Sequence, residues 1–172
     1  LHGLTHGNAW YKIVNDSFLM AEPRGREATG VAFNIGNEIH VLKDNMTASD
    51  FIKSTRYRIM FKGFFNDDKV ENNCFSVLGH CRLATHGLTS NLTNNHPIVM
   101  NELVGIHNGI VTNLDEFITS AKKTGIEEVN DSKLFFSHLN QNLSHSDNPL
   151  CTFRESFRKA KGTLALAFFH KR

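Results

Sequence analysis

The spacing of apolar residues in the first third of the chain predicts a helix followed by a pair of strands. Between residues 8 and 20 the apolar side chains recur three or four positions apart, which is typical of an amphipathic helix, and Pro23 ends it. Two short apolar runs follow, at 30–33 and 38–42, and the turn between them contains glycine and asparagine, so they are predicted to form a hairpin. Residues 50–60 fit a helix and a loop equally well.

Strands and helices are mixed in the remaining pattern. A buried strand is predicted at 75–84, and further strands at 102–106, continuing at 110–111, and at 163–170. Helices are predicted over 114–123, from 131 to 142, and from 149 to about 161. Asn113 and Asp131 are the expected N-caps of the first two helices, and Pro149 suits the first turn of the third. This order predicts an α+β fold with layers of sheet and helix, and no linker interrupts a single domain over 1–172.

Composition excludes several classes of protein. The 172 residues are 40% hydrophobic and carry a net charge of only +2, without the concentrated basic face that nucleic-acid binding requires. No apolar run approaches the roughly 20 residues of a membrane helix, and residues 1–8 do not resemble a secretory signal. The three cysteines have no CxxC spacing, so neither a disulfide framework nor a metal site is expected. These features indicate a cytoplasmic protein that binds neither nucleic acid nor membrane.

Three short stretches combine glycine with polar side chains in apolar surroundings. They are RGREATG at 24–30, GHCRLATHG at 79–87 and HNGI at 107–110, the last preceded by NHP at 95–97. Arg82 can bind a carboxylate through two parallel hydrogen bonds, and Asn108 with the N–H of Gly109 can form an oxyanion hole. Together these groups predict a site for a small carboxylate-bearing substrate that undergoes acyl transfer.

Each of these features also has a structural interpretation. Arg82 alone could be an ion-pair partner, Asn108-Gly109 alone is typical of a type I′ turn, and Asp131 alone is typical of an N-cap. The histidines at 86, 96 and 107 are, one by one, typical of a core or a loop. The three stretches in this order are far more specific than any one of them.

With these stretches the chain resembles the glutaminase domain of class II glutamine amidotransferases over nearly its whole length. That family carries an Arg-Gly-x-Asp-Ser-x-Gly-like loop, a Gly-His-x-Arg-x-Ala-Thr-x-Gly strand end, a His-Pro and then a His-Asn-Gly, and a later Asp-Ser that opens a helix, matched here by Asp131-Ser132. The resemblance implies the four-layer αββα fold of N-terminal-nucleophile hydrolases.

The two ends depart from the family pattern. Family chains begin Cys-Gly-Ile-x-Gly, and Leu1-His2-Gly3 aligns with Ile-x-Gly, so we expect the nucleophilic cysteine two positions before Leu1. A second alignment puts His2 at the cysteine position and makes the protein a non-hydrolase. Family domains usually continue past the strand at 163–170, so a compact variant, a fragment and one piece of a longer synthase all remain open.

The resemblance also implies a reaction, the hydrolysis of L-glutamine to glutamate and ammonia by an N-terminal cysteine whose own α-amine is the base. The implied roles are an oxyanion hole at Asn108 and Gly109, binding of the α-carboxylate by Arg82 and of the α-ammonium by Asp131, a pocket lined by Thr85 and His86, and loop support by Arg24. No metal or organic cofactor is expected, and ammonia would pass to a synthase domain or subunit. Two alternatives are a non-catalytic binding or regulatory module on the same fold and a hydrolase of another amide.

Overall fold

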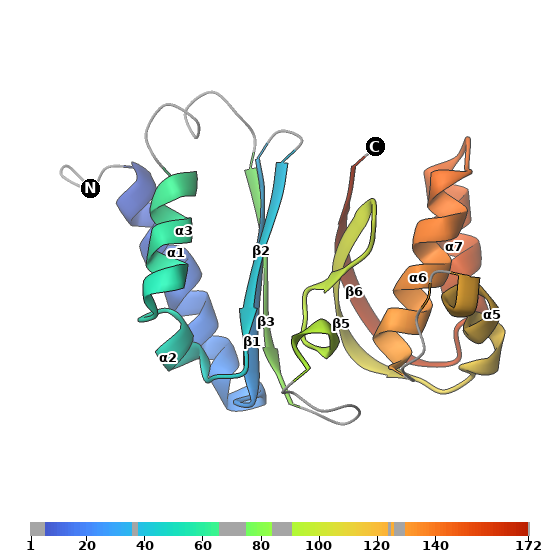
Figure 1. Cartoon of the computed structure of the whole chain (residues 1–172), viewed down its shortest axis with the longest axis horizontal. Helices are drawn as coiled ribbons and strands as arrows, with labels where there is room; N and C mark the ends of the chain where they lie inside the picture. The colour runs from blue at the N-terminus through green and yellow to red at the C-terminus, as the bar shows by residue number, and fades with distance from the viewer. Residues whose placement is uncertain are drawn as a thin grey trace. The chain divides into compact units, whose positions relative to one another are not determined.

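The computed structural model describes residues 6–35, 38–65, 75–83, 91–123, 125 and 130–171. The chain divides into two compact units, Leu1–Pro97 and Ile98–Arg172. In each unit a three-stranded antiparallel sheet is accompanied by helices, so the predicted α+β class is confirmed (Figure 1).

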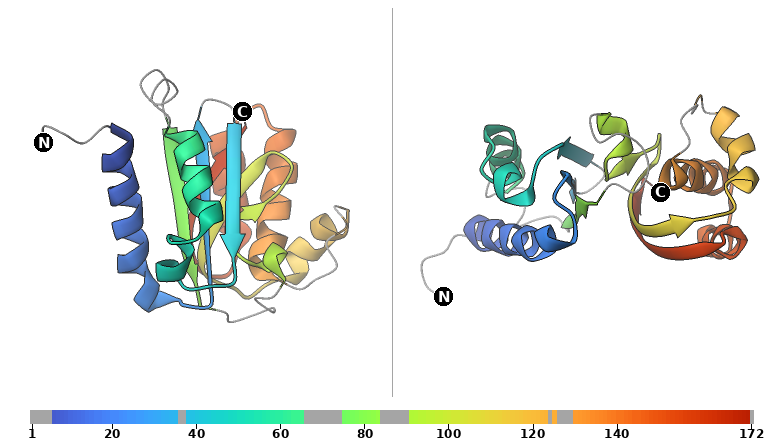
Figure 2. Two further views of the ribbon diagram at one scale, coloured as in Figure 1. Left: turned by 60° about the vertical axis from the view of Figure 1, so that its left-hand side comes forward. Right: turned by 90° about the horizontal axis from the view of Figure 1, so that it is seen from below.

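The first unit contains a sheet with the strand order β2-β1-β3. Its elements are α1 (His6–Ala21), η1 (Glu22–Arg24), β1 (Ala28–Ile35), β2 (Glu38–Asp44), α2 (Ala48–Phe51), α3 (Thr55–Phe64), β3 (Phe75–Arg82) and η2 (Leu92–Asn94). Figures 1 and 2 show α1 and α3 lying along one face of this sheet. The predicted first helix and the predicted hairpin are confirmed by α1 and by the pairing of β1 with β2.

Aromatic side chains form the core between this sheet and its helices. Phe33 of the central strand contacts three phenylalanines of the α3 region, Phe61, Phe64 and Phe65. The ambiguous segment at 50–60 becomes two helices, because Thr47 and Ser54 each accept a backbone N–H and cap a separate first turn.

The strand predicted at 75–84 is confirmed as β3, but it is shorter and less buried than predicted. β3 ends at Arg82, and most of its side chains are only partly buried. The reason is its place in the sheet, since β3 pairs with β1 alone among the described strands and therefore lies at an edge.

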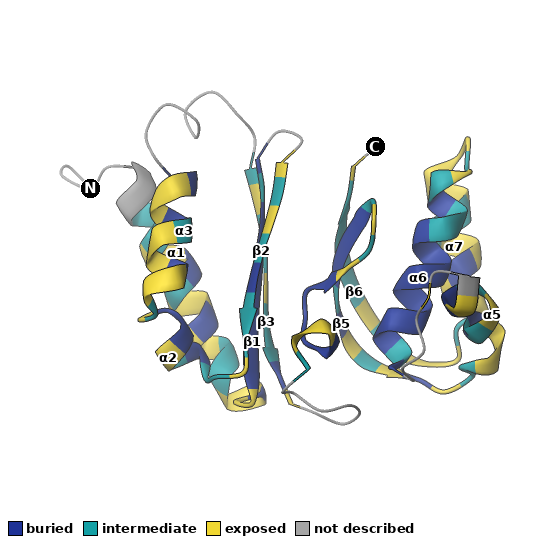
Figure 3. Cartoon of the chain, viewed as in Figure 1, coloured by how far each residue is buried: buried dark blue, intermediate teal, exposed yellow. Residues whose placement is uncertain are grey.

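The second unit contains a sheet with the strand order β4-β5-β6 and a long central helix. Its elements are β4 (Ile98–Val99), β5 (Leu103–Val111), α5 (Asp115–Lys123), α6 (Asp131–Ser144), α7 (Pro149–Lys159) and β6 (Gly162–His170). Nearly the whole first half of α6 is buried, since the helix packs against β5, α5 and α7 (Figure 3). The predicted stripe that includes Phe135 and Leu139 is part of this core.

Two predicted N-caps in the second unit are wrong, and the turn that Asn108-Gly109 would favour on its own does not form. β5 runs through both residues, which pair with Ala165 and Leu164 of β6. Asp131 is not the cap of α6; Asn130 takes that position and accepts the N–H of Lys133 at 3.0 Å. The side chain of Asn113 bonds instead to the α7–β6 connection, where it accepts the N–H of Lys161 at 2.6 Å.

Candidate active site

The first two sequence stretches meet in the first unit. The N–H of Glu27 donates to the carbonyl of Arg82 at 3.2 Å, and Ala28 pairs with Arg82 across the β1–β3 ladder. Gly25 approaches the same strand end so closely that a Cβ there would overlap the Arg82 carbonyl and lie 2.5 Å from the N of Leu83. The loop at 24–30 is therefore packed directly against the end of β3.

The NHP stretch at 95–97 joins the same cluster through two cationic side chains. Arg82 is only 5% exposed, and its Nη1 donates to Oδ1 of Asn95 at 2.6 Å. Lys43 of β2 donates to the carbonyls of Asn95 and Pro97 at 2.8 and 2.9 Å. The sequence did not single out Asn95 as the residue that orients Arg82; the only signal was its place beside His96-Pro97.

The other site residues predicted in this unit are less informative. Arg24 is exposed at the end of η1. Thr85 and His86 lie outside the described residues, as do the first residues of the chain.

In the second unit β5 carries the HNG stretch. Side chains alternate along a strand, and the side chain of His107 is buried toward α6, whereas Asn108 is exposed and points to the opposite face of the sheet. Gly109 has a φ of +146°, and a Cβ at this position would overlap the carbonyl oxygen of Thr163 on β6 and lie 2.7 Å from its carbonyl carbon. Only glycine suits this backbone.

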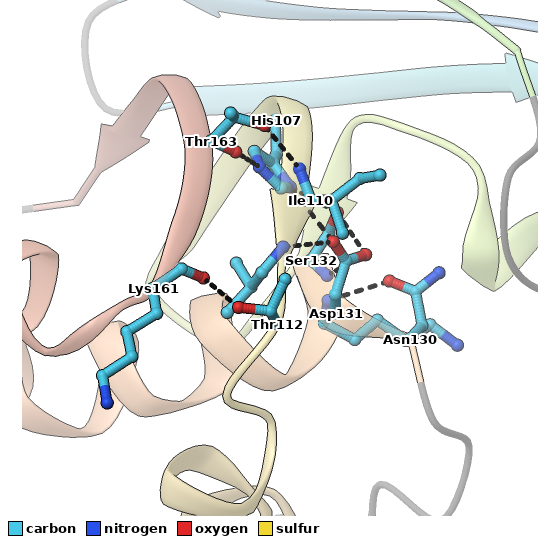
Figure 4. Close-up of polar contacts among 10 residues, drawn as sticks. His107, Ile110, Thr112, Asn130, Asp131, Ser132, Lys161 and Thr163 are labelled. Atoms are coloured by element: carbon cyan, nitrogen blue, oxygen red, sulfur yellow. Dashed lines mark hydrogen bonds and ion pairs between the residues drawn. The ribbon is translucent and has the colours of Figure 1, made fainter.

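Asp131 is anchored at the start of α6, beside the same strand (Figure 4). Its Oδ2 accepts the N–H of Val111 at 3.0 Å, and its Oδ1 accepts the N–H of Ser132 at 2.8 Å. The positive end of the helix dipole further favours a carboxylate in the first turn. The predicted site residues Asn108, Gly109 and Asp131 are thus all on or beside β5, but the side chain of Asn108 points away from α6, at whose start Asp131 lies.

Two residues of this cluster were not among the predicted site residues. Ser132 Oγ lies 2.9 Å from Nδ1 of His107, and the carbonyl of Thr163 lies 3.4 Å from its Nε2. Ser132 carried a signal, as the second residue of the Asp-Ser pair. Thr163 carried none, because it is 56 residues away from its partner.

Two kinds of feature are absent from the part of the chain that the structure describes. There, no cluster of three or more His, Cys, Asp or Glu side chains is arranged to hold a metal ion. Within the same residues, no helix has both the length and the apolar character needed to span a membrane.

Comparison with solved structures identifies the fold. The chain aligns with the glutamine phosphoribosylpyrophosphate amidotransferase from B. subtilis at a TM-score of 0.62 and 16% identity, covering 94% of this chain and 32% of that one. A second structure, described as the allosteric regulatory enzyme of purine biosynthesis, aligns at a TM-score of 0.69 and 19% identity over 94% of this chain and 33% of the other. The fold is therefore that of the N-terminal-nucleophile amidotransferases.

Sequence comparison points to the same class. No protein-family profile matches the chain. It is 28% identical over 154 residues to the glutamine–fructose-6-phosphate aminotransferase (isomerizing) of Helicobacter pylori, and 26% identical over 164 residues to the enzyme of that name from Chlamydia pneumoniae. These alignments cover 88% and 92% of this chain but only 24% and 25% of the relatives. The chain is similar to class II glutamine amidotransferases and spans about a quarter of the length of these relatives.

Proposed function

We propose that this chain is a single glutamine amidotransferase domain that hydrolyses L-glutamine to glutamate and ammonia. The nucleophile in this proposal is a cysteine two positions before Leu1, at a free N-terminus. Its thiol attacks the side-chain amide carbon, and its own α-amine takes the thiol proton and passes it to the departing ammonia. Water then hydrolyses the thioester and releases glutamate.

The proposed residue roles are those that the resemblance implies. Asn108 and the N–H of Gly109 stabilise the oxyanion, Arg82 binds the α-carboxylate and Asp131 binds the α-ammonium, while Arg24, Thr85 and His86 keep the supporting roles that the resemblance implies. The observation that carries the proposal is the arrangement around β5. Gly109 has a backbone that only glycine adopts, and two residues later the N–H of Val111 fixes Asp131.

Arg82 is suited to its role by burial and by rigidity. Arg82 is 5% exposed and its guanidinium is held by Asn95, so its direction is fixed, and a charge-assisted pair with a carboxylate is stronger where water is excluded. Asp131 accepts two N–H groups and the hydroxyl of Ser132, and an ionised carboxylate offers about four lone-pair positions, so it retains capacity for one more donor.

The acceptor of the ammonia belongs to the proposal as well. The relatives are named for amino transfer from glutamine to fructose 6-phosphate, and this chain spans about a quarter of their length. We therefore assign the acceptor to a synthase domain or subunit beyond these 172 residues. A cytoplasmic location is consistent with a chemistry that needs a reduced thiol.

Ammonia release by the protein produced from its encoded start codon tests the proposal. Mass spectrometry of the N-terminus identifies the first residue, and a coupled glutamate dehydrogenase assay measures ammonia from L-glutamine, with L-asparagine as the comparison. Asn108→Ala is expected to lower kcat by about 10² to 10³, as loss of one oxyanion donor typically does. His145→Gln, an exposed change at the far end of α6, is the matched control.

Two outcomes would contradict the proposal. A folded protein that begins with cysteine and yet releases no ammonia would exclude glutamine hydrolysis. A protein that binds glutamine without hydrolysing it, and has no cysteine before Leu1, would instead identify the non-catalytic module.

A further inference from the structure

The imidazole of His107 occupies a central place in the second unit that the proposed reaction leaves unexplained. Its side chain is 2% exposed and turned toward α6, away from the face to which Asn108 points, so it does not contact the proposed oxyanion. Each ring nitrogen nevertheless has a partner that touches one of the proposed functional groups (Figure 4).

The Nε2 side is linked to the proposed oxyanion hole. Nε2 lies 3.4 Å from the carbonyl oxygen of Thr163, and this is the group against which Gly109 packs. The hydroxyl of Thr163 also accepts the N–H of Ile110 at 3.3 Å. Thr163 therefore holds the peptide group that follows Gly109 and packs against Gly109 itself.

The Nδ1 side is linked to the proposed ammonium-binding carboxylate. Nδ1 lies 2.9 Å from Oγ of Ser132, and Ser132 donates its backbone N–H to Oδ1 of Asp131 at 2.8 Å. Oδ2 of Asp131 lies 3.9 Å from Nδ1 and accepts the N–H of Val111. The ring thereby holds the first turn of α6 against β5.

Both ring nitrogens of His107 have hydrogen-bond partners. Oγ of Ser132 lies 2.9 Å from Nδ1 and donates to Oδ1 of Asp131 at 3.4 Å, and Nε2 lies 3.4 Å from the carbonyl oxygen of Thr163. The arrangement is not that of a nucleophilic serine triad, in which serine and aspartate occupy opposite ring nitrogens. Here Ser132 and Asp131 are both on the Nδ1 side.

We propose that His107 is a positioning residue for glutamine hydrolysis, with Nε2 holding the oxyanion backbone through Thr163 and Nδ1 holding Asp131 through Ser132. This inference rests on the proposed function. Loss of the Nε2 contact should therefore mainly change kcat, and loss of the Nδ1 contact should mainly change KM. The reason is that an oxyanion contact acts in the transition state, whereas an ammonium contact acts on the bound substrate as well.

Two substitutions remove one ring nitrogen each. Asparagine matches the reach of Nδ1 and lacks Nε2, so His107→Asn is expected to lower kcat by about 10- to 100-fold with KM changed by less than about threefold. Glutamine matches the reach of Nε2 and lacks Nδ1, so His107→Gln is expected to raise KM by about tenfold with a smaller effect on kcat. Ser132→Ala breaks the Nδ1 side without changing the ring and should resemble His107→Gln.

The experiment measures kcat and KM for glutamine on the full chain with its encoded N-terminus. The kcat of each variant is normalised to its folded fraction, which is measured by circular dichroism. His145→Gln is the control and is expected to match the unsubstituted chain. If the His107 variants do not fold, Ser132→Ala alone decides, and a KM equal to that of the unsubstituted chain overturns the proposal.

A purely structural histidine gives a different result. All three variants would then melt at lower temperature while the kcat and KM of the folded fraction stay unchanged, which overturns the positioning role alone. An unsubstituted chain that releases no ammonia overturns the proposed function and the positioning role together, so the two failures are distinguishable.

Discussion

Gly109→Ala tests the backbone geometry of the proposed oxyanion hole without relying on activity. The substitution places a side chain on a residue with a φ of +146°, and such strain costs about 1–3 kcal/mol. The new Cβ also overlaps the Thr163 carbonyl and lies 2.7 Å from its carbon, so paired backbone must shift, at a cost of about 1–3 kcal/mol more. The sum is roughly 4 kcal/mol, which corresponds to a fall in Tm of about 8–16 °C for a chain of 172 residues.

Two other glycines allow the costs of backbone strain and of steric overlap to be measured separately in the same assay. Gly125 also has a positive φ, +73°, but a Cβ there meets nothing within 4 Å, so Gly125→Ala carries the strain alone and should cost about 1–2 kcal/mol. Gly63 lies on the exposed side of α3 with open space around it, so Gly63→Ala should stabilise by about 0.5–1 kcal/mol. Urea unfolding and thermal melts of the three variants measure these differences. A Gly109→Ala variant no less stable than Gly125→Ala would refute the close approach of β5 to Thr163.

Three further outcomes follow from buried groups. Arg82→Ala should raise the KM for glutamine by about 10- to 100-fold in the ammonia assay, since a bound carboxylate loses its charged partner, and an unchanged KM removes Arg82 from the site. Burial, and then the charge of Glu22, raise the pKa of the Cys81 thiol to about 11. The free energy of unfolding that the neutral thiol contributes is therefore complete below pH 9. It is lost as the pH rises toward 11. Urea midpoints between pH 8 and 11 should therefore fall more for the unsubstituted chain than for Cys81→Ser, and equal falls would contradict this. Burial, and then the charge of Lys159, lower the pKa of His138, so its contribution is present above pH 6.5 and is lost as the pH falls. His138→Gln should lose less stability than the unsubstituted chain between pH 7.5 and 5, and a larger loss would contradict the burial of a neutral imidazole.

The fold was predictable where the local pattern was strong. The hairpin of β1 and β2 and the helix α1 have clear periodicity, and both are confirmed. The division of residues 50–60 was not predictable from apolar spacing, because it depends on the caps Thr47 and Ser54. Two adjacent residues could cap α6, and the choice of Asn130 is decided by a tertiary contact that takes the Asp131 side chain to Val111.

The residues of the candidate site were predictable from the sequence, but their arrangement in space was not. Asn108-Gly109 locally favours a turn, and only pairing with a strand more than fifty residues later keeps it extended. The partners that orient the site, Asn95 for Arg82 and Thr163 for His107, are ordinary polar residues whose proximity follows from the fold. Apolar spacing cannot reveal such pairs, because it records which face of an element is buried and not what that face meets.

The central claim is that this chain hydrolyses glutamine, and the most direct test is ammonia release from L-glutamine by the protein made from its encoded start, with its N-terminal residue determined by mass spectrometry. The proposal predicts an N-terminal cysteine, ammonia and glutamate in equal amounts, and loss of both products when that cysteine is replaced by serine. An intact, folded protein with an N-terminal cysteine and no ammonia release from glutamine would contradict it.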